Sequence, residues 1–256
     1  MSALAASNVT VSIGTKEIVR DASLSINAGE LVALVGPNGA GKTTLMRALA
    51  GLVSARGTIT LAGKPLGSLG PRERARGVSY LPQGHIFHWP MSVESIVMLG
   101  RAPHADAFSS VSPDDRAAIT HAMATTETQM FAERAVTTLS GGEKARVALA
   151  RALATQAPVL LADEPTAALD PRHQLVVMEL LRNAARNGNA ILAIMHDLTL
   201  AARFADRVLV MNEGRIVAEG APAEALAPEL LASVFGVEAV TVAVGDKRVP
   251  IARRAL

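Results

Sequence analysis

Residues 31–44 read LVALVGPNGAGKTT, in which five apolar residues lead into a glycine-rich turn and a lysine–threonine pair. The turn has the spacing G-x-x-x-x-G-K-[ST] of a phosphate-binding loop, which predicts a strand, the loop and then a helix. Its glycines allow the backbone to curl until the N–H groups point into a concavity of the size of a phosphate. The binding residues predicted from this turn are Gly36, Pro37, Asn38, Gly39, Ala40, Gly41, Lys42, Thr43 and Thr44.

Two side chains of this loop indicate the kind of phosphate. Lys42 supplies a charge for the β and γ oxygens of a nucleoside triphosphate, and the Thr43 hydroxyl is placed to hold Mg²⁺. The helix expected from about Lys42 adds the positive end of its dipole. Glycine-rich turns also join strands to helices without any ligand, but here the strand, the helix and the complete spacing occur together. The sequence therefore predicts a nucleoside triphosphate and Mg²⁺ as cofactors.

Composition argues against several classes of protein. No uncharged apolar run in the 256 residues approaches the roughly 20 that a membrane-spanning helix needs. The chain has no cysteine for disulfides or thiolate metal sites, and it opens without the basic start and apolar core of a signal peptide. A net charge of +2, with no long basic stretch, argues against nucleic acid as a partner. We therefore expect a cytoplasmic protein.

The chain alternates between strand and helix patterns. The first sixty residues read as β-rich, and residues 90–155 read as helical, with Ser112 capping a helix over residues 113–125. Further on, buried strands are expected to alternate with helices, which implies a mostly parallel sheet. We expect an α/β fold in which this sheet carries an N-terminal antiparallel β subdomain and an inserted α-helical subdomain. The chain is read as one domain, 1–256, with residues 1–89 and 156–256 as its core.

A second phosphate-related feature follows the apolar run at residues 159–162, where a strand ends in Asp163 and Glu164. Beside the phosphate loop, Asp163 can hold Mg²⁺ through water, and Glu164 can polarise the water that attacks the γ-phosphate. Acidic pairs at strand ends are usually just solvated. The P-loop in the same chain favours the catalytic interpretation.

Residues 139–143, LSGGE, form the most discriminating motif. Ser140 with Glu143 three residues later is a capping box, so part of the signal is the start of a helix that runs to about Thr155. Gly141 and Gly142 weaken a first helical turn, so the capping box does not explain why two glycines occur there. The phosphate of another molecule, approaching the bare backbone at the helix start, would explain them.

These three motifs together resemble the nucleotide-binding subunit of an ATP-binding cassette (ABC) transporter, from Val9 to about Phe235. That family usually reads Leu-Ser-Gly-Gly-Gln, and Glu143 departs from it, as in several importer ATPases. The resemblance implies a P-loop NTPase (RecA-like) fold. It also makes Gln83 a ligand of Mg²⁺ and a γ-phosphate sensor, residues 168–170 the D-loop, and His196 the switch histidine. The catalytic residues expected are thus Glu164, His196 and Gln83, with Thr43, Gln83 and Asp163 on Mg²⁺.

One family feature is missing. The early strand usually carries an aromatic residue that stacks on adenine, and the matching position here is Ile13. An aliphatic contact gives up the stacking term, roughly 1–3 kcal/mol where it has been measured on nucleic acids. Base selectivity is therefore expected to be loose.

The resemblance also implies partners. Each ATP is expected between the P-loop of one subunit and Ser140, Gly141 and Gly142 of the other, so two copies form a homodimer. Residues 85–91, HIFHWPM, match the segment where the family docks its membrane permease, although they could equally pack the joint between core and helical subdomain. His85 and His88 alone are too few for a metal site.

Residues 100–104, GRAPH, resemble a segment of ATPases that energise import of iron–siderophore complexes, haem and cobalamin, and residues 230–237 resemble the tail of that subfamily. Such an ATPase is peripheral at the cytoplasmic face of the inner membrane, with permease subunits and, indirectly, a substrate-binding protein. The bland alternative is a turn after Pro103 with His104 in solvent. The substrate stays open, with a slight lean toward haem or iron complexes.

Other functions stay open at this point. The chain could be the ATPase of an exporter or of another importer, although exporter ATPases are often fused to a membrane domain. It could also be a non-transport ABC protein acting on DNA or ribosomes, but those usually carry two cassettes, a long coiled coil or a basic extension. A P-loop kinase would have no use for residues 139–143.

Overall fold

The computed structural model describes residues 2–84, 87–105, 110–245 and 247–256. Within these residues the core sheet has the strand order β10-β9-β3-β8-β7-β6. Its strands are β3 (Leu31–Val35), β6 (Val78–Leu81), β7 (Val159–Asp163), β8 (Ala190–Ile194), β9 (Arg207–Asn212) and β10 (Arg215–Gly220). All neighbours run parallel except β10, which pairs antiparallel with β9. The mostly parallel sheet expected from the sequence is confirmed.

Both faces of this sheet are covered, and for this reason β3 is apolar at every position rather than at alternate ones. Leu31, Ala33 and Val35 face a core cluster that includes α6 (Pro171–Arg186) and α7 (Leu198–Phe204). Val32 and Leu34 face a second cluster with α1 (Lys42–Leu49) and the N-terminal strands. The P-loop that follows β3 therefore begins from a rigid support.

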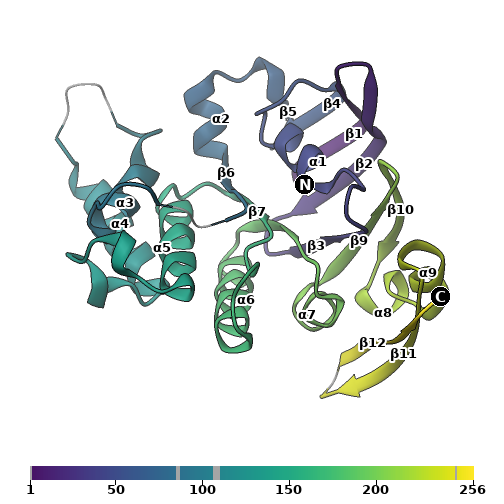
Figure 1. Cartoon of the computed structure of the whole chain (residues 1–256). Helices are drawn as coiled ribbons and strands as arrows, with labels where there is room; N and C mark the ends of the chain where they lie inside the picture. Colours follow the sequence, from purple (N-terminus) through teal and green to yellow (C-terminus); the bar gives the residue numbers. More distant parts are fainter. Residues whose placement is uncertain (1, 85–86, 106–109, 246) are drawn as a thin grey trace.

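The N-terminal part forms a separate antiparallel sheet in the order β2-β1-β4-β5, above the core sheet in Figure 1. Its strands are β1 (Ser2–Ile13), β2 (Lys16–Asn27), β4 (Arg56–Leu61) and β5 (Lys64–Pro65). A 3₁₀ turn η1 (Leu66–Ser68) and α2 (Pro71–Gly77) return the chain to β6. The antiparallel β subdomain is thus confirmed.

A block of helices stands to one side of the sheets in Figure 1 and has its own buried core. We call it the helical block; it comprises α3 (Val93–Met98), η2 (Leu99–Arg101), α4 (Pro113–Thr125), η3 (Gln129–Phe131), η4 (Val136–Thr138) and α5 (Gly141–Ala154). The Ser112 side chain caps α4 by accepting a hydrogen bond from the Asp115 amide. The inserted helices expected from the sequence are therefore present.

The C-terminal part adds α8 (Pro222–Ala225), α9 (Pro228–Phe235) and a hairpin of β11 (Val237–Val244) and β12 (Lys247–Ala255). Ala239 and Val249 of this hairpin are buried in the same core cluster as α7. Among the described residues, none of the helices combines the length and the hydrophobicity that crossing a bilayer requires.

Candidate functional site

The P-loop joins the end of β3 to the start of α1, and its backbone requires glycine at two points. Gly36 has φ 155°, and a Cβ there would overlap the carbonyl of Met211. Gly41 has φ 101°, and its Cβ would come within 2.8 Å of the Ile18 carbonyl oxygen. At Gly36 and Gly41 the loop therefore passes closer to neighbouring backbone than a Cβ atom would permit. Without these Cβ atoms the backbone N–H groups of the loop stay accessible.

Lys42 is buried, with only 6% of its surface exposed, and its ammonium lies inside the loop. Nζ donates hydrogen bonds to the carbonyl oxygens of Gly36 at 2.7 Å and Pro37 at 2.9 Å. Burial lowers the pKa of Lys42, and the carboxylates of Glu164 and Asp163 act in the opposite direction. The loop thus holds a poorly hydrated positive charge, which fits a triphosphate.

Thr43 and Asp163 meet although 120 residues separate them in sequence. The Thr43 hydroxyl donates to Oδ1 of Asp163 at 3.1 Å, and the Tyr80 hydroxyl donates to Oδ2 at 2.9 Å. Burial raises the pKa of Asp163, which is 1% exposed. A hydroxyl next to a desolvated carboxylate is a donor set that suits Mg²⁺.

The structure also brings together the three residues predicted to be catalytic. Glu164 Oε2 accepts a hydrogen bond from Nε2 of Gln83 at 2.6 Å, and its Oε1 lies 2.6 Å from Nε2 of His196. Glu164 itself has a left-handed backbone, with φ 52°, which turns its side chain at the end of β7. The Gln83 amide therefore contacts the carboxylate of Glu164, and the role on Mg²⁺ that the resemblance implies for Gln83 stays a prediction.

A pocket of about 390 Å³ opens over these groups. It is lined by Ile13, Ile18, Asn38, Gly39, Gly41, Lys42, Thr43, Thr44, Glu164 and His196. Ile13 lies at this pocket with 64% of its surface exposed, which is the position expected for the adenine contact. The pocket thus combines the phosphate loop, the carboxylate and the histidine in one cavity.

Residues 140–142, which we call the signature segment, begin α5 in the helical block and are not part of this pocket. The capping box is complete: Glu143 donates its amide to the Ser140 hydroxyl at 3.3 Å, and the Ser140 amide donates to the Glu143 carboxylate at 2.7 Å. Gly141 is exposed with open space at its Cβ position, as an approaching phosphate requires. Gly142 is buried instead, against the imidazole of His173 in the same chain.

Two residues of this region escaped the sequence reasoning. Tyr80 is the only tyrosine of the chain and lies on β6, which pairs with β7, so its contact with Asp163 follows from strand register. His173 follows Asp170 by three residues, and its amide donates to Oδ1 of Asp170 at 3.0 Å. The spacing of Asp170 and His173 could have been recognised in the sequence as a helix cap. The contact of His173 with Gly142 could not.

The Gly-Arg-Ala-Pro-His segment forms a clamp inside the helical block. Arg101 is 7% exposed; it donates to Asp115 at 2.7 Å and to the Ala154 carbonyl oxygen, the last of α5, at 2.8 Å. His104 contacts the Thr155 carbonyl oxygen at 3.0 Å. The alternative that left His104 in solvent is therefore wrong.

Residues 85–91 have two interpretations, docking of a permease and packing of the joint between core and helical block, and the residues of this segment differ in how they bear on them. His85 and Ile86 lie outside the described residues. Phe87 is partly buried and packs against both the sheet core and the core of the helical block, as a joint residue should. Trp89, in contrast, is 75% exposed. Across the described part of the chain, no group of three or more metal-ligating side chains occurs.

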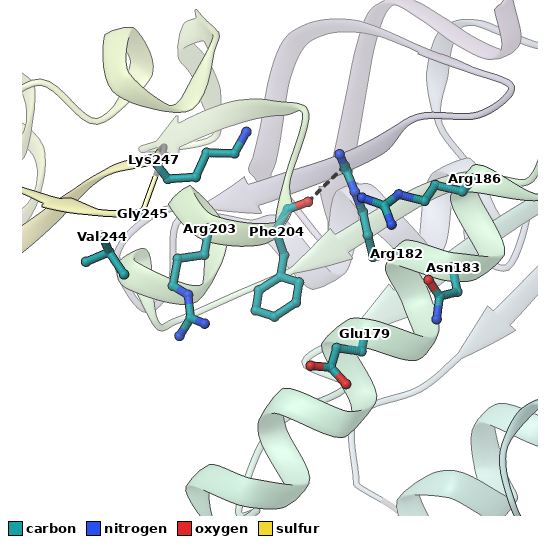
Figure 2. Close-up of a pocket in the computed structure, with 9 residues that line it drawn as sticks. All are labelled: Glu179, Arg182, Asn183, Arg186, Arg203, Phe204, Val244, Gly245 and Lys247. Carbon is teal, nitrogen blue, oxygen red and sulfur yellow. Dashed lines mark hydrogen bonds between the residues drawn. The ribbon is translucent and has the colours of Figure 1, made fainter.

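A wider hollow of about 660 Å³ lies elsewhere, between α6, α7 and the β11–β12 hairpin (Figure 2). Arg182 crosses it to donate to the Phe204 carbonyl oxygen at 3.0 Å and pairs with Asp206 at 2.6 Å. None of the predicted site residues lines this hollow. The candidate functional site is therefore the P-loop pocket and not this hollow.

Comparison with known proteins gives consistent matches. The model of the ABC transporter family matches residues 19–167. The chain is 47% identical to the hemin import ATP-binding protein HmuV of Streptomyces coelicolor, over 90% of this chain and 82% of that protein. It is 43% identical to the cobalamin import ATP-binding protein BtuD of Halobacterium salinarum, over 88% of this chain and 56% of that protein.

Solved structures share the fold. One chain of a metal-chelate type ABC transporter in an inward-facing conformation superposes with a TM-score of 0.84 at 24% identity, covering 98% of this chain and 96% of that one. A dimeric ATP-binding cassette with bound ADP and phosphate superposes with a TM-score of 0.74 at 26% identity, covering 86% and 98%.

Proposed function

The chain belongs to the ABC transporter family, and from this membership we propose that it powers the import of haem or a related iron complex. It is the ATP-hydrolysing subunit of an importer. The observation that carries the choice of substrate is the 47% identity to a hemin import ATPase over 90% of the chain. Cobalamin is the runner-up, because an ATPase of cobalamin import is 43% identical.

We propose that ATP binds in the P-loop pocket. The buried ammonium of Lys42 and the open amides of the loop support this placement of the phosphates. Thr43 and Asp163 would hold Mg²⁺, which would neutralise charge on the β and γ oxygens. Asp163 suits this role because a desolvated carboxylate gains a partner for its charge when a cation binds.

We assign the polarisation of the attacking water to Glu164. Its carboxylate is held by Gln83 on one oxygen and by His196 on the other, so its orientation is fixed before substrate arrives. His196 lines the pocket beside Glu164, and both partners of Glu164 would exchange their contacts when ATP binds. Gln83 precedes the segment that leads to the exposed Trp89, and through this segment the site would communicate with a permease.

We further propose that two copies of the chain form the working unit. The signature segment lies outside the pocket of its own chain, so a second copy would complete each ATP site. A dimeric cassette with the same fold supports this arrangement. The subunits would bind permease subunits at the cytoplasmic face of the inner membrane, with a substrate-binding protein on the other side. Residues 1–256 then form one ATPase domain, with residues 90–155 as its helical subdomain.

The test is reconstitution of the chain with its co-purified permease and binding protein in vesicles. ATP hydrolysis should rise when the binding protein is loaded with haem, and not with cobalamin. Lys42→Ala should abolish the hydrolysis, because it removes the desolvated charge at the phosphates, whereas the exposed Lys64→Ala should not. Stimulation by cobalamin alone would transfer the assignment to the runner-up.

A further inference from the structure

The imidazole of His173 occupies the space where a side chain of Gly142 would lie. A Cβ built on Gly142 would come within 2.6 Å of Nε2 of that ring and closer still to Cγ and Cδ2. Separations below 3.0 Å are essentially never seen for real Cβ atoms. A side chain at the second glycine of the signature segment would therefore have to displace this ring. Gly141, with open space at the same point, has no such neighbour.

The opposite side of the same ring is bound to the D-loop, residues 168–170. Nδ1 of His173 lies 2.7 Å from Oδ2 of Asp170. Because a carboxylate only accepts hydrogen bonds, Nδ1 carries the proton in this contact. Asp170 also caps α6, because its Oδ1 accepts a hydrogen bond from the His173 amide. The two carboxylate oxygens of Asp170 thus bind the backbone and the ring of the same histidine. Only 24% of the His173 side chain is exposed.

This ring adds a contact at the start of α5, a helix that already packs with α6 in the main core cluster through Ala145, Ala148 and Leu149. Gly142 belongs to α5 and the helical block, whereas His173 and Asp170 belong to α6 and the core. In the paired arrangement proposed above, the signature segment faces the nucleotide of the second copy, and the D-loop, which the resemblance to the family places across the dimer interface, is held beside it by this ring. A shift of the helical block that moved α5 away from α6 would break this contact together with that packing.

We propose that His173 is a positioning residue that holds the signature segment and the D-loop together, so that both meet the partner's nucleotide as one surface. The inference rests on the proposed dimer. It assigns no contact with ATP to His173 itself. Its role is to convert two separate segments into one preorganised interface, which saves the cost of ordering them during association.

The experiment replaces the imidazole in two different ways. In the Glu164→Gln background, ATP-driven dimerisation is followed by analytical ultracentrifugation for His173→Phe, which keeps a ring, and His173→Asn, which keeps a donor near Nδ1. Both variants should raise the protein concentration needed for half-dimerisation. We expect an increase of about tenfold, because an overpacked or loosened contact usually has a free-energy cost of this size. ATP affinity of the monomer should stay unchanged, because the P-loop is built from other elements. His121→Ala, at an exposed position of α4, serves as the matched control.

The decisive readout is a rescue. Gly142→Ala should impair dimerisation by a similar factor in the presence of His173, because its methyl group meets the ring. When His173→Ala is added, the double variant should dimerise no worse than His173→Ala alone, because the methyl group then has space. A merely structural ring would change the thermal midpoint without this pattern in dimerisation.

Each remaining outcome counts against a specific statement. If the Glu164→Gln protein fails to dimerise with ATP, the paired arrangement is wrong and this inference falls with it. If that protein dimerises but the His173 variants match it, His173 has no positioning role. If Gly142→Ala is equally harmful with and without the imidazole, the glycine serves the phosphate alone.

Discussion

At the scale of single residues, Glu164 should separate ATP binding from ATP hydrolysis. Glu164→Gln keeps the shape of the side chain but removes a carboxylate that can take a proton, so turnover should fall by about 10²–10⁴-fold. ATP binding should persist, because Lys42 and the loop amides remain. The variant should then accumulate as an ATP-bound dimer, seen by sizing with ATP and by the loss of phosphate release.

The matched control is Glu213→Gln, in the exposed turn between β9 and β10, which should leave turnover unchanged. A Glu164→Gln protein that stays monomeric with ATP and hydrolyses it at full rate would contradict the assignment of the catalytic carboxylate.

The sequence alone could place most of this site, for a simple topological reason. Lys42 follows β3 and Glu164 follows β7, and the carboxyl ends of parallel strands in one sheet meet at the same edge. The ring of His173 beneath Gly142 could not be foreseen in this way. Spacing along the chain fixes where a helix begins, but not which side chain of a neighbouring helix fills the gap left by a glycine.

At the scale of elements, Arg101 holds the end of α5 in place. Its guanidinium pairs with Asp115, and the two side chains are 8% and 14% exposed. Arg101→Met would leave this carboxylate buried without its partner, at a cost of about 3 kcal/mol in the free energy of unfolding. Urea unfolding of the two proteins measures the difference.

The comparison is Arg56→Met, which breaks an ion pair with Glu17 whose side chains are 74% and 45% exposed. That loss should stay below about 1 kcal/mol because solvent screens the pair. Equal losses for the two variants would show that Arg101 is an ordinary surface charge and that residues 100–104 form no clamp.

The same clamp predicts a dependence on acid. The Ser112 hydroxyl and the Arg101 guanidinium lower the pKa of Asp115 to about 2. An unfolded aspartate titrates near 3.9, so the ionised Asp115 stabilises the fold above about pH 4 and loses this contribution as the pH falls toward 2. The difference in unfolding free energy between the native chain and Asp115→Asn should therefore shrink across that interval. A difference independent of pH would contradict this.

Local signals fixed some elements and not others. α4 runs over Pro113–Thr125, which is the range expected. Its start could be predicted because Ser112, the N-cap, and Pro113, the first helical residue, are local signals in the sequence. The β11–β12 hairpin was not expected, since Pro250 lies inside its second strand and its stability comes from Ala239 and Val249 packing in the α7 cluster. Burial against a distant helix leaves no local mark on a sequence.

At the scale of the whole molecule, the exposed Trp89 gives a direct test of the permease contact. It is the only tryptophan of the chain, so labelling with 5-fluorotryptophan gives a single ¹⁹F resonance. Because Trp89 is 75% exposed, the chemical shift of that resonance should be that of a solvent-exposed ring in the isolated subunit. The chemical shift should change when permease in nanodiscs buries the ring.

The control carries the label at a different exposed site, Val217→Trp on β10 in a Trp89→Phe background. Its resonance should not move, since β10 is the sheet edge strand farthest from β6 in the strand order and so from the segment after Gln83. A Trp89 signal that stays constant while sedimentation shows the complex formed would place the permease elsewhere. In that case the exposed ring would need another partner, and the role of the segment in the structure would be the packing of Phe87 and Met91 against the buried cores.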